Sequence, residues 1–103
     1  MSKKYFDDLT FKDVDFTKEP LEIGEYDSCI FQNCRLYSCN LTDIIFANAT
    51  FLDCDLSMSK LENTAFKDVR FQNCKLLGLH FEDCNPFLLA LSFENCTLNL
   101  ASF

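Results

Sequence analysis

The sequence predicts an all-β fold in which the chain winds into about five square coils of short parallel strands. Two observations carry this prediction: large apolar residues recur at every fifth position, and similar six-residue segments recur about every twenty positions. Hydrophobic residues make up 49% of the 103 residues, which excludes a disordered chain and fits one small domain. Each side of the predicted coil can be justified from the two repeats.

The five-residue series consists of Phe, Leu or Tyr at every fifth position from residue 6 to residue 81, without a gap. An α-helix would spread such a series around its axis, because five residues advance about 500° at about 100° per residue. A flat strand would place alternate members on opposite faces. The series therefore predicts a chain that bends after each five residues, so that each large apolar residue points inward.

The twenty-residue repeat shows that four such bends close one coil. The segments FQNCRL, FLDCDL, FQNCKL and FENCTL begin at residues 31, 51, 71 and 93, and FKDVDF at residue 11 has the same form. Like residues then stack along each side of the coil. The four stacks are Phe6, Tyr26, Phe46 and Phe66; Phe11, Phe31, Phe51, Phe71 and Phe93; Phe16, Leu36, Leu56, Leu76 and Leu98; and Leu21, Leu41, Leu61, Phe81 and Phe103.

Two further series accompany the large apolar residues. Small or medium residues stand two positions before them and are expected to point inward as well, and Asp or Asn often stands two positions after them, as residues that stabilise turns do. On these grounds the sequence resembles the pentapeptide-repeat family over residues 4–103. The resemblance implies a right-handed quadrilateral parallel β-helix, a pentapeptide-repeat solenoid.

One break interrupts the repeat within the single predicted domain, which covers residues 1–103. The five-residue series slips by two positions near Asn85-Pro86 and resumes at Leu88. We therefore expect a bulge or small loop between coils near residues 84–88.

The seven cysteines are predicted to be packing residues. Six of them fall in the small inward series, and Cys84 joins them if the unshifted frame continues to it. Free cysteine behaves as a small hydrophobe. Stacked side chains point in parallel, which disfavours disulfides, and the spacing of Cys29, Cys34 and Cys39 sends each to a different side, which disfavours zinc.

No catalytic, metal or cofactor site is predicted. His80, the only histidine, falls at an outward position, and no nucleophile motif or phosphate-binding loop is present. The sequence thus favours a protein that is not an enzyme. A formal charge of −7 argues against direct binding of nucleic acid.

The start of the chain has no apolar segment typical of a signal peptide, and the run PFLLALSF is too short to cross a bilayer. With an odd number of cysteines, these features favour the reducing cytoplasm.

The C-terminal coil is the candidate interface. From Cys84 to Phe103 the only charged residue is Glu94. In the shifted frame Phe87, Leu89 and Leu100 point outward, beside a last coil, ending at Phe103, whose core residues have nothing stacked on them. Repeat arrays need polar caps. We expect a homodimer through this coil, a partner that covers it, or a chain that continues beyond it.

Two functions follow as hypotheses. The first is a cytoplasmic protein-interaction scaffold that is not an enzyme and whose partner the sequence does not name. The alternative comes from the resemblance: some family members protect type II topoisomerases from quinolones, and the segment CDLSMSKLENTAF at 54–66 is similar to that branch. It implies a DNA mimic that binds DNA gyrase or topoisomerase IV.

Overall fold

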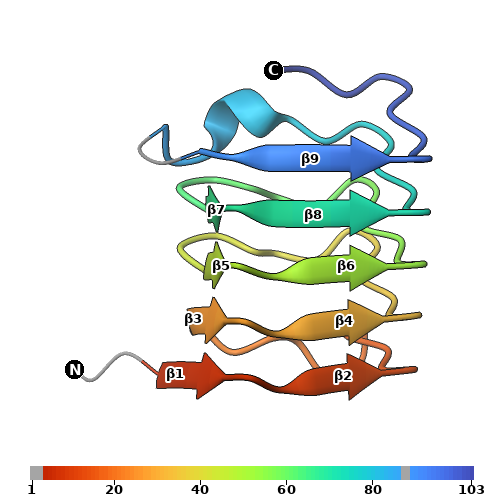
Figure 1. The fold of residues 1–103 in the computed structure, drawn as a ribbon. Helices are drawn as coiled ribbons and strands as arrows, with labels where there is room; N and C mark the ends of the chain where they lie inside the picture. Colours follow the sequence, from red (N-terminus) through yellow and green to blue (C-terminus); the bar gives the residue numbers. More distant parts are fainter. Residues whose placement is uncertain (1–3, 87–88) are drawn as a thin grey trace.

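The computed structural model describes residues 4–86 and 89–103, and these residues form a parallel β-solenoid with almost no helix (Figure 1). The nine strands of the described residues are short. They are β1 (Lys4–Asp7), β2 (Thr10–Lys12), β3 (Gly24–Asp27), β4 (Ile30–Gln32), β5 (Ile45–Ala47), β6 (Thr50–Leu52), β7 (Ala65–Lys67), β8 (Val69–Gln72) and β9 (Leu91–Glu94). The all-β solenoid predicted from the two repeats is confirmed.

The strands stack into two sheets that form adjoining faces of the solenoid. Face 1 holds β1, β3, β5 and β7, and face 2 holds β2, β4, β6, β8 and β9 (Figure 1). From β1 to β8, paired strand residues are twenty positions apart, as Phe11 and Phe31 are, and all strand pairs are parallel. The other two faces hold only isolated parallel bridges among the described residues. Face 3 follows face 2 along the chain and has, for example, the bridge between Asp15 and Arg35. Face 4 follows face 3 and has the bridge between Asn40 and Lys60.

The core consists of the stacked residues predicted from the five-residue series. On face 2 the ring centroids of Phe31 and Phe51 are 4.6 Å apart and the rings are nearly parallel, at 8°. Rings of neighbouring faces meet edge to face, as Phe31 and Phe46 do at 5.8 Å. Both arrangements suit the quadrupole of an aromatic ring, so the stacks on adjoining faces support each other.

The small inward positions also contribute hydrogen bonds between successive coils. The thiols of Cys34, Cys54 and Cys74 donate to backbone carbonyls 23 residues earlier, at 3.2–3.3 Å. The hydroxyls of Ser59 and Thr64 donate to the equivalent carbonyls at 2.6 and 2.7 Å. Cysteine therefore fills the narrow interior and satisfies a buried carbonyl with one side chain.

The corners of the solenoid use the left-handed backbone conformation. Nearly all of the residues in this conformation are Asp, Asn or Ser, and Asp and Asn adopt it at a lower cost than most residues with a side chain. Side-chain amides link corners of successive coils: Asn33 donates to Asp13 at 2.7 Å, and Asn63 donates to Asp43 at 2.9 Å. The predicted turn role of the Asx series agrees with this geometry, and it explains how the chain turns with only two glycines.

The fifth coil differs from the others. Phe71 pairs with Phe93, a separation of 22 residues, which places a two-residue insertion before β9. A short 3₁₀ helix, η1 (Phe81–Asp83), precedes the insertion, and Cys84 is buried. Within the described residues face 2 has five strands and face 1 has four, because no strand pairs with the outer edge of β7. Leu88, expected to point inward, lies outside the described residues.

Candidate functional site

The outward side chains divide the solenoid into two surfaces of different charge. Each face takes one five-residue segment from every coil, so the charged residues can be assigned by register. Face 4 and face 1 adjoin each other, and we call them together the acidic surface. They carry eleven acidic side chains against three basic ones, a formal charge of −8. The acidic residues are Asp7, Asp8, Glu19, Glu22, Glu25, Asp27, Asp43, Glu62, Asp68, Glu82 and Asp83, and the basic residues are Lys4, Lys60 and Lys67.

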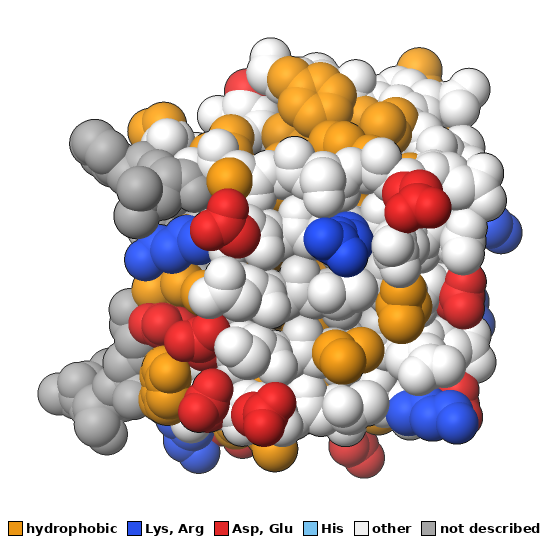
Figure 2. Space-filling view, viewed as in Figure 1, with side chains coloured by type: hydrophobic (Ala, Val, Ile, Leu, Met, Phe, Trp, Pro, Cys, Tyr) orange, Lys and Arg blue, Asp and Glu red, His pale blue; other side chains and the backbone are white. Residues whose placement is uncertain are grey.

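Face 2 and face 3 form the mixed surface, on which five acidic and five basic side chains cancel. These are Asp13, Asp15, Asp53, Asp55 and Glu94, with Lys12, Lys18, Arg35, Arg70 and Lys75. Along face 3 a bridged column alternates in sign, from Asp15 through Arg35 and Asp55 to Lys75. Figure 2 looks onto the β2–β9 sheet and shows acidic and basic side chains interspersed. The net negative charge of the described residues therefore lies on one half of the circumference of the solenoid.

The C-terminal end of the solenoid is apolar and exposed. Leu100 is 88% exposed and Phe103 is 71% exposed, and Leu89 is exposed as well. Figure 2 shows hydrophobic side chains gathered at this end, above β9 at the top of the view. Phe87, the fourth predicted interface residue, lies outside the described residues. Thus the structure places three of the four predicted side chains at one end of the molecule, in contact with solvent.

A polar cluster ties the last residues of the chain to face 4. Ser102 donates its hydroxyl hydrogen to the carboxylate of Glu82 at 2.7 Å, and its oxygen lies 3.0 Å from Nδ1 of His80. The hydrogen bond from Ser102 lowers the pKa of Glu82. His80 is exposed, as predicted, and its Nδ1 lies 3.4 Å from Oε2 of Glu82, whose carboxylate also accepts the hydrogen bond from Ser102. The cluster is a surface tether.

The cysteine thiols of the described residues are all free and five of the seven are buried. Hydrogen bonds with the thiols of Cys34 and Cys74, together with burial, raise the pKa of Cys54. Burial raises the pKa of Cys84 to about 12. The thiols of Cys54 and Cys84 therefore stay protonated at neutral pH and are weak nucleophiles and ligands. The hydrogen bond with Cys54 instead lowers the pKa of Cys34 to about 7. Among residues 4–86 and 89–103 no three His, Cys, Asp or Glu side chains are grouped as metal ligands.

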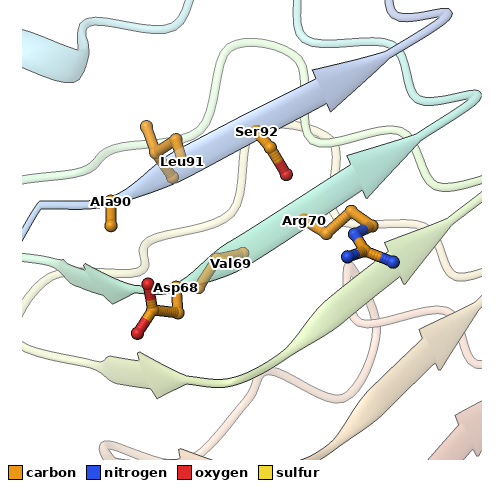
Figure 3. A pocket seen from close by; sticks show the side chains of 6 residues that line it. All are labelled: Asp68, Val69, Arg70, Ala90, Leu91 and Ser92. Atoms are coloured by element: carbon orange, nitrogen blue, oxygen red, sulfur yellow. The ribbon is translucent and has the colours of Figure 1, made fainter.

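The insertion before β9 leaves a shallow hollow of about 220 Å³ on the outside of the solenoid (Figure 3). Its lining comes from the start of β8 and the start of β9, namely Asp68, Val69, Arg70, Ala90, Leu91 and Ser92. In Figure 3 the carboxylate of Asp68 and the guanidinium of Arg70 point in different directions. The two charged groups therefore do not converge on one point, as a small-molecule site requires.

The repeat register, the stacked core and the left-handed corners can be compared with known proteins. A family model described as the pentapeptide repeat region matches residues 25–103. The chain belongs to the pentapeptide-repeat family. No curated protein matches the chain at a significant level.

Solved structures of QnrB1, described as a plasmid-mediated fluoroquinolone resistance protein, are among those similar to this chain. One trypsin-treated variant has a TM-score of 0.65 and 22% identity over 95% of this chain and 50% of its own. A second trypsin-treated variant gives a TM-score of 0.48 at 16% identity, and full-length QnrB1 gives 0.42 at 15%. The match to the first shows a common fold. The chain spans about half to three fifths of the length of these structures.

The division of charge between the acidic and mixed surfaces was not recognised from the sequence. The signal was available, since assigning each charged residue to its face by the five-residue register gives the same count. Within the described ranges, no helix combines the length and hydropathy that a bilayer crossing requires.

Proposed function

We propose that this chain is a protein-interaction scaffold without enzymatic activity, and that the acidic surface is the part that a partner contacts. The observation that carries the proposal is the uneven distribution of charge, with a formal charge of −8 on the acidic surface and zero on the mixed surface. A field of one sign attracts a basic partner and speeds its association. We therefore expect a basic protein as the partner and the cytoplasm as its location.

The rigidity of the solenoid supports this function. The core residues of the central coils are almost fully buried, and successive coils are joined by strand pairs, aromatic stacks and side-chain bonds. Charges fixed on such a frame lose little conformational entropy when a partner binds. The raised pKa values of the buried Cys54 and Cys84 thiols, and the lack of a group of three metal-ligating side chains among the described residues, favour a binding role over catalysis.

Two charge-matched variants test this proposal. Glu25→Gln with Glu62→Gln removes two charges from the acidic surface and keeps side chains of nearly the same size. Asp53→Asn with Glu94→Gln removes two charges from the mixed surface, and Gln72 can still bond at position 94.

Each tagged variant and the unmodified chain would be used for affinity capture from a cytoplasmic extract, with quantitative mass spectrometry. We expect the same basic proteins from the unmodified chain and the mixed-surface variant, and at least tenfold less of them with the acidic-surface variant. Equal recovery with both variants would contradict the proposal.

A second candidate is a DNA mimic that binds DNA gyrase or topoisomerase IV and protects it from quinolones. The observation in its favour is the acidic surface on a fold shared with a QnrB1 structure. Five coils at about 4.8 Å give a rod of about 24 Å, and duplex DNA of that length carries about 14 negative charges. The eleven carboxylates of the acidic surface approach that number, although three lysines interrupt them.

A supercoiling assay with purified DNA gyrase, with and without a fluoroquinolone, separates the two candidates. The DNA mimic predicts inhibition of supercoiling, or protection from the drug, at micromolar protein. The acidic-surface double variant should lose the effect and the mixed-surface variant should keep it. Activity unchanged by micromolar protein would exclude this candidate and leave the general scaffold.

We also propose the C-terminal coil as an interface, formed by Leu89, Leu100 and Phe103, with Phe87 in the same sequence segment. The three described side chains are exposed and apolar. Exposed apolar groups that gather in one place favour contact with another protein surface. The occupant proposed here is a second copy of the chain.

A further inference from the structure

Four cysteines form a column with regular spacing at the corner between face 2 and face 3. They are Cys34, Cys54, Cys74 and Cys96, at equivalent positions of successive coils. Each sulfur lies 3.2–3.5 Å from two backbone carbonyl oxygens, one two residues earlier and one in the previous coil. Because the four side chains repeat one arrangement, neighbouring Sγ atoms are separated by the coil spacing of about 4.8 Å.

This spacing suits one kind of bond between stacked thiols better than the others. A disulfide holds its sulfurs about 2.05 Å apart, so the side chains would have to leave their shared arrangement to form one. Zinc takes four tetrahedral ligands, whereas two neighbouring coils of the column offer two ligands in a line. A metal–thiolate bond is about 2.3 Å long, as for zinc, so a cation bound linearly between two sulfurs needs them about 4.6 Å apart. The column therefore matches a two-coordinate cation.

A hollow of about 450 Å³ on the outside of the solenoid reaches one pair of these cysteines. Cys34 and Cys54 both belong to its lining, although each is no more than 3% exposed. The charged residues of the lining are Asp53, Asp55, Arg35 and Lys75, whose formal charges cancel. The hollow therefore does not repel an incoming cation, and it supplies basic groups that balance an anionic complex. This access distinguishes Cys34 and Cys54 from the other neighbouring pairs of the column.

We propose that Cys34 and Cys54 bind one soft monovalent cation, of the class of Cu(I), in linear coordination between their sulfurs. Thiolates select such cations, which displace thiol protons even where the thiol is a weak ligand for harder metals. Each sulfur loses its proton to solvent and forms one bond to the cation, with no change of oxidation state, so the complex carries one negative charge. The site lies on the mixed surface and is independent of the partner proposed for the acidic surface.

Silver(I), which has the same charge and does not change oxidation state in the assay, is the probe for the unmodified chain. One equivalent added to the reduced, ¹³C-labelled protein should shift the Cβ resonances of Cys34 and Cys54 in NMR spectra. Cys29 is the internal control, because it is a buried inward cysteine with Leu9 and Ala49 at the equivalent positions of the neighbouring coils. Unshifted Cys34 and Cys54, or an equal shift at Cys29, would overturn the inference.

Variants test whether two stacked thiols are required. Cys74→Ser leaves Cys34 and Cys54 as the one pair of cysteines at equivalent positions of neighbouring coils, and it should retain one silver ion in native mass spectra. Adding Cys54→Ser, which keeps the donor to the Phe31 carbonyl, should release the silver at a glutathione concentration at least tenfold lower.

The matched control adds Cys29→Ser to Cys74→Ser and should hold silver as tightly as Cys74→Ser alone. Equal loss of silver with Cys29→Ser and with Cys54→Ser would show binding to single thiols and would contradict the site. Zinc(II) added under the same conditions should not be retained, because the pair offers two ligands in a line. Retention of zinc by Cys34 and Cys54 would contradict linear coordination.

Discussion

At the scale of single residues, the position two before each large apolar residue mostly holds a small or medium side chain, often Cys, Ser, Thr or Ala and at some coils Val, Ile or Leu. A thiol or hydroxyl there gains a bond to a carbonyl of the previous coil. Cys54 bonds to Phe31 and Ser59 bonds to Leu36 by the same geometry. The cysteines are therefore interchangeable with serine in their role, although the thiol is the more apolar group.

The effect of replacing cysteine by serine on stability can be measured at Cys54, which is 2% exposed. Cys54→Ser keeps the donor to the Phe31 carbonyl, so the free energy of unfolding should fall by no more than about 1 kcal/mol. Cys54→Leu adds volume to a filled interior and loses the donor, and it should cost about 1–3 kcal/mol. Urea denaturation monitored by circular dichroism gives both values. If the serine variant lost as much stability as the leucine variant, the thiol would not be acting as a hydroxyl does.

Ionisation of Tyr26 should make the folding stability of the chain depend on pH in the alkaline range. Burial is the main cause that raises the pKa of this phenol to about 12, and its hydroxyl donates to the carbonyl of Glu22 at 2.7 Å. The unfolded chain has a tyrosine pKa of about 10. The stability from this shift is fully present below pH 10 and is lost as pH rises toward 12.

Stability measured by urea denaturation should therefore fall between pH 10 and 12. Tyr26→Phe, which lacks the ionisable group, should show a shallower decline over that interval. A phenolate that forms near pH 10 in the folded protein, seen by its absorbance, would show that Tyr26 is not buried as described.

The inward residues could be predicted from the sequence because a period of five admits few structures. Phe, Leu and Tyr at that spacing specify the core, and the structure buries the predicted members of the central coils. The bonds from Cys54 and Ser59 could not be predicted in the same way. They depend on the distance between coils and on a side-chain rotamer, which composition does not determine.

At the scale of elements, the corners between strands are the costly parts of the fold. Each requires a left-handed residue, and most are Asp, Asn or Ser. Met58 and Leu100 are exceptions, with φ of 64° and 63°. A leucine in this conformation costs about 1–2 kcal/mol. At Leu100 an apolar, fully solvated side chain is kept at that cost, which agrees with its place in the proposed interface.

The contact between β1 and β3 depends on Gly24. A Cβ atom at this position would lie 2.5 Å from the carbonyl oxygen of Lys4. The equivalent position one coil later is Ile44, so the regular spacing of coils accommodates a side chain. Gly24→Ala should therefore move β1 outward and lower the free energy of unfolding by about 1–2 kcal/mol.

Hydrogen exchange locates that effect. The amides of β1 should exchange faster in Gly24→Ala, and those of β5 to β8 should keep their protection. Ala49→Gly, at a regular inward position, serves as the comparison, since it should weaken packing without moving β1. Unchanged exchange in β1 would contradict the close contact at Gly24.

The sequence predicted the position of the insertion before β9 but not its structure. The slip of two positions near Asn85-Pro86 predicted a break, and the pairing of Phe71 with Phe93 shows two extra residues in that interval. The 3₁₀ helix, and the lack of a fifth strand on face 1 within the described residues, could not be predicted. A phase slip gives the number of inserted residues, and it does not determine which face absorbs them.

At the scale of the whole molecule, the fold separates its interior from its function. The interior repeats the same contacts in every coil, so it specifies a rigid rod. Among the described residues no three His, Cys, Asp or Glu side chains are grouped as metal ligands. The outward positions are free to vary, and here they divide the charge between an acidic and a mixed surface. Net charge alone, at −7, suggested an acidic protein, and only the four-sided register shows where the charge lies.

The most direct test of this account is an NMR titration of the isotope-labelled chain with a lysine-rich peptide. If a partner binds the acidic surface, amide shifts should change along it, at residues such as Glu25, Asp27 and Glu62. Residues of the mixed surface, such as Arg70 and Lys75, should not respond, and added salt should abolish the changes. Shifts spread evenly over all four faces, or concentrated on the mixed surface, would contradict the claim that the acidic surface is where a partner binds.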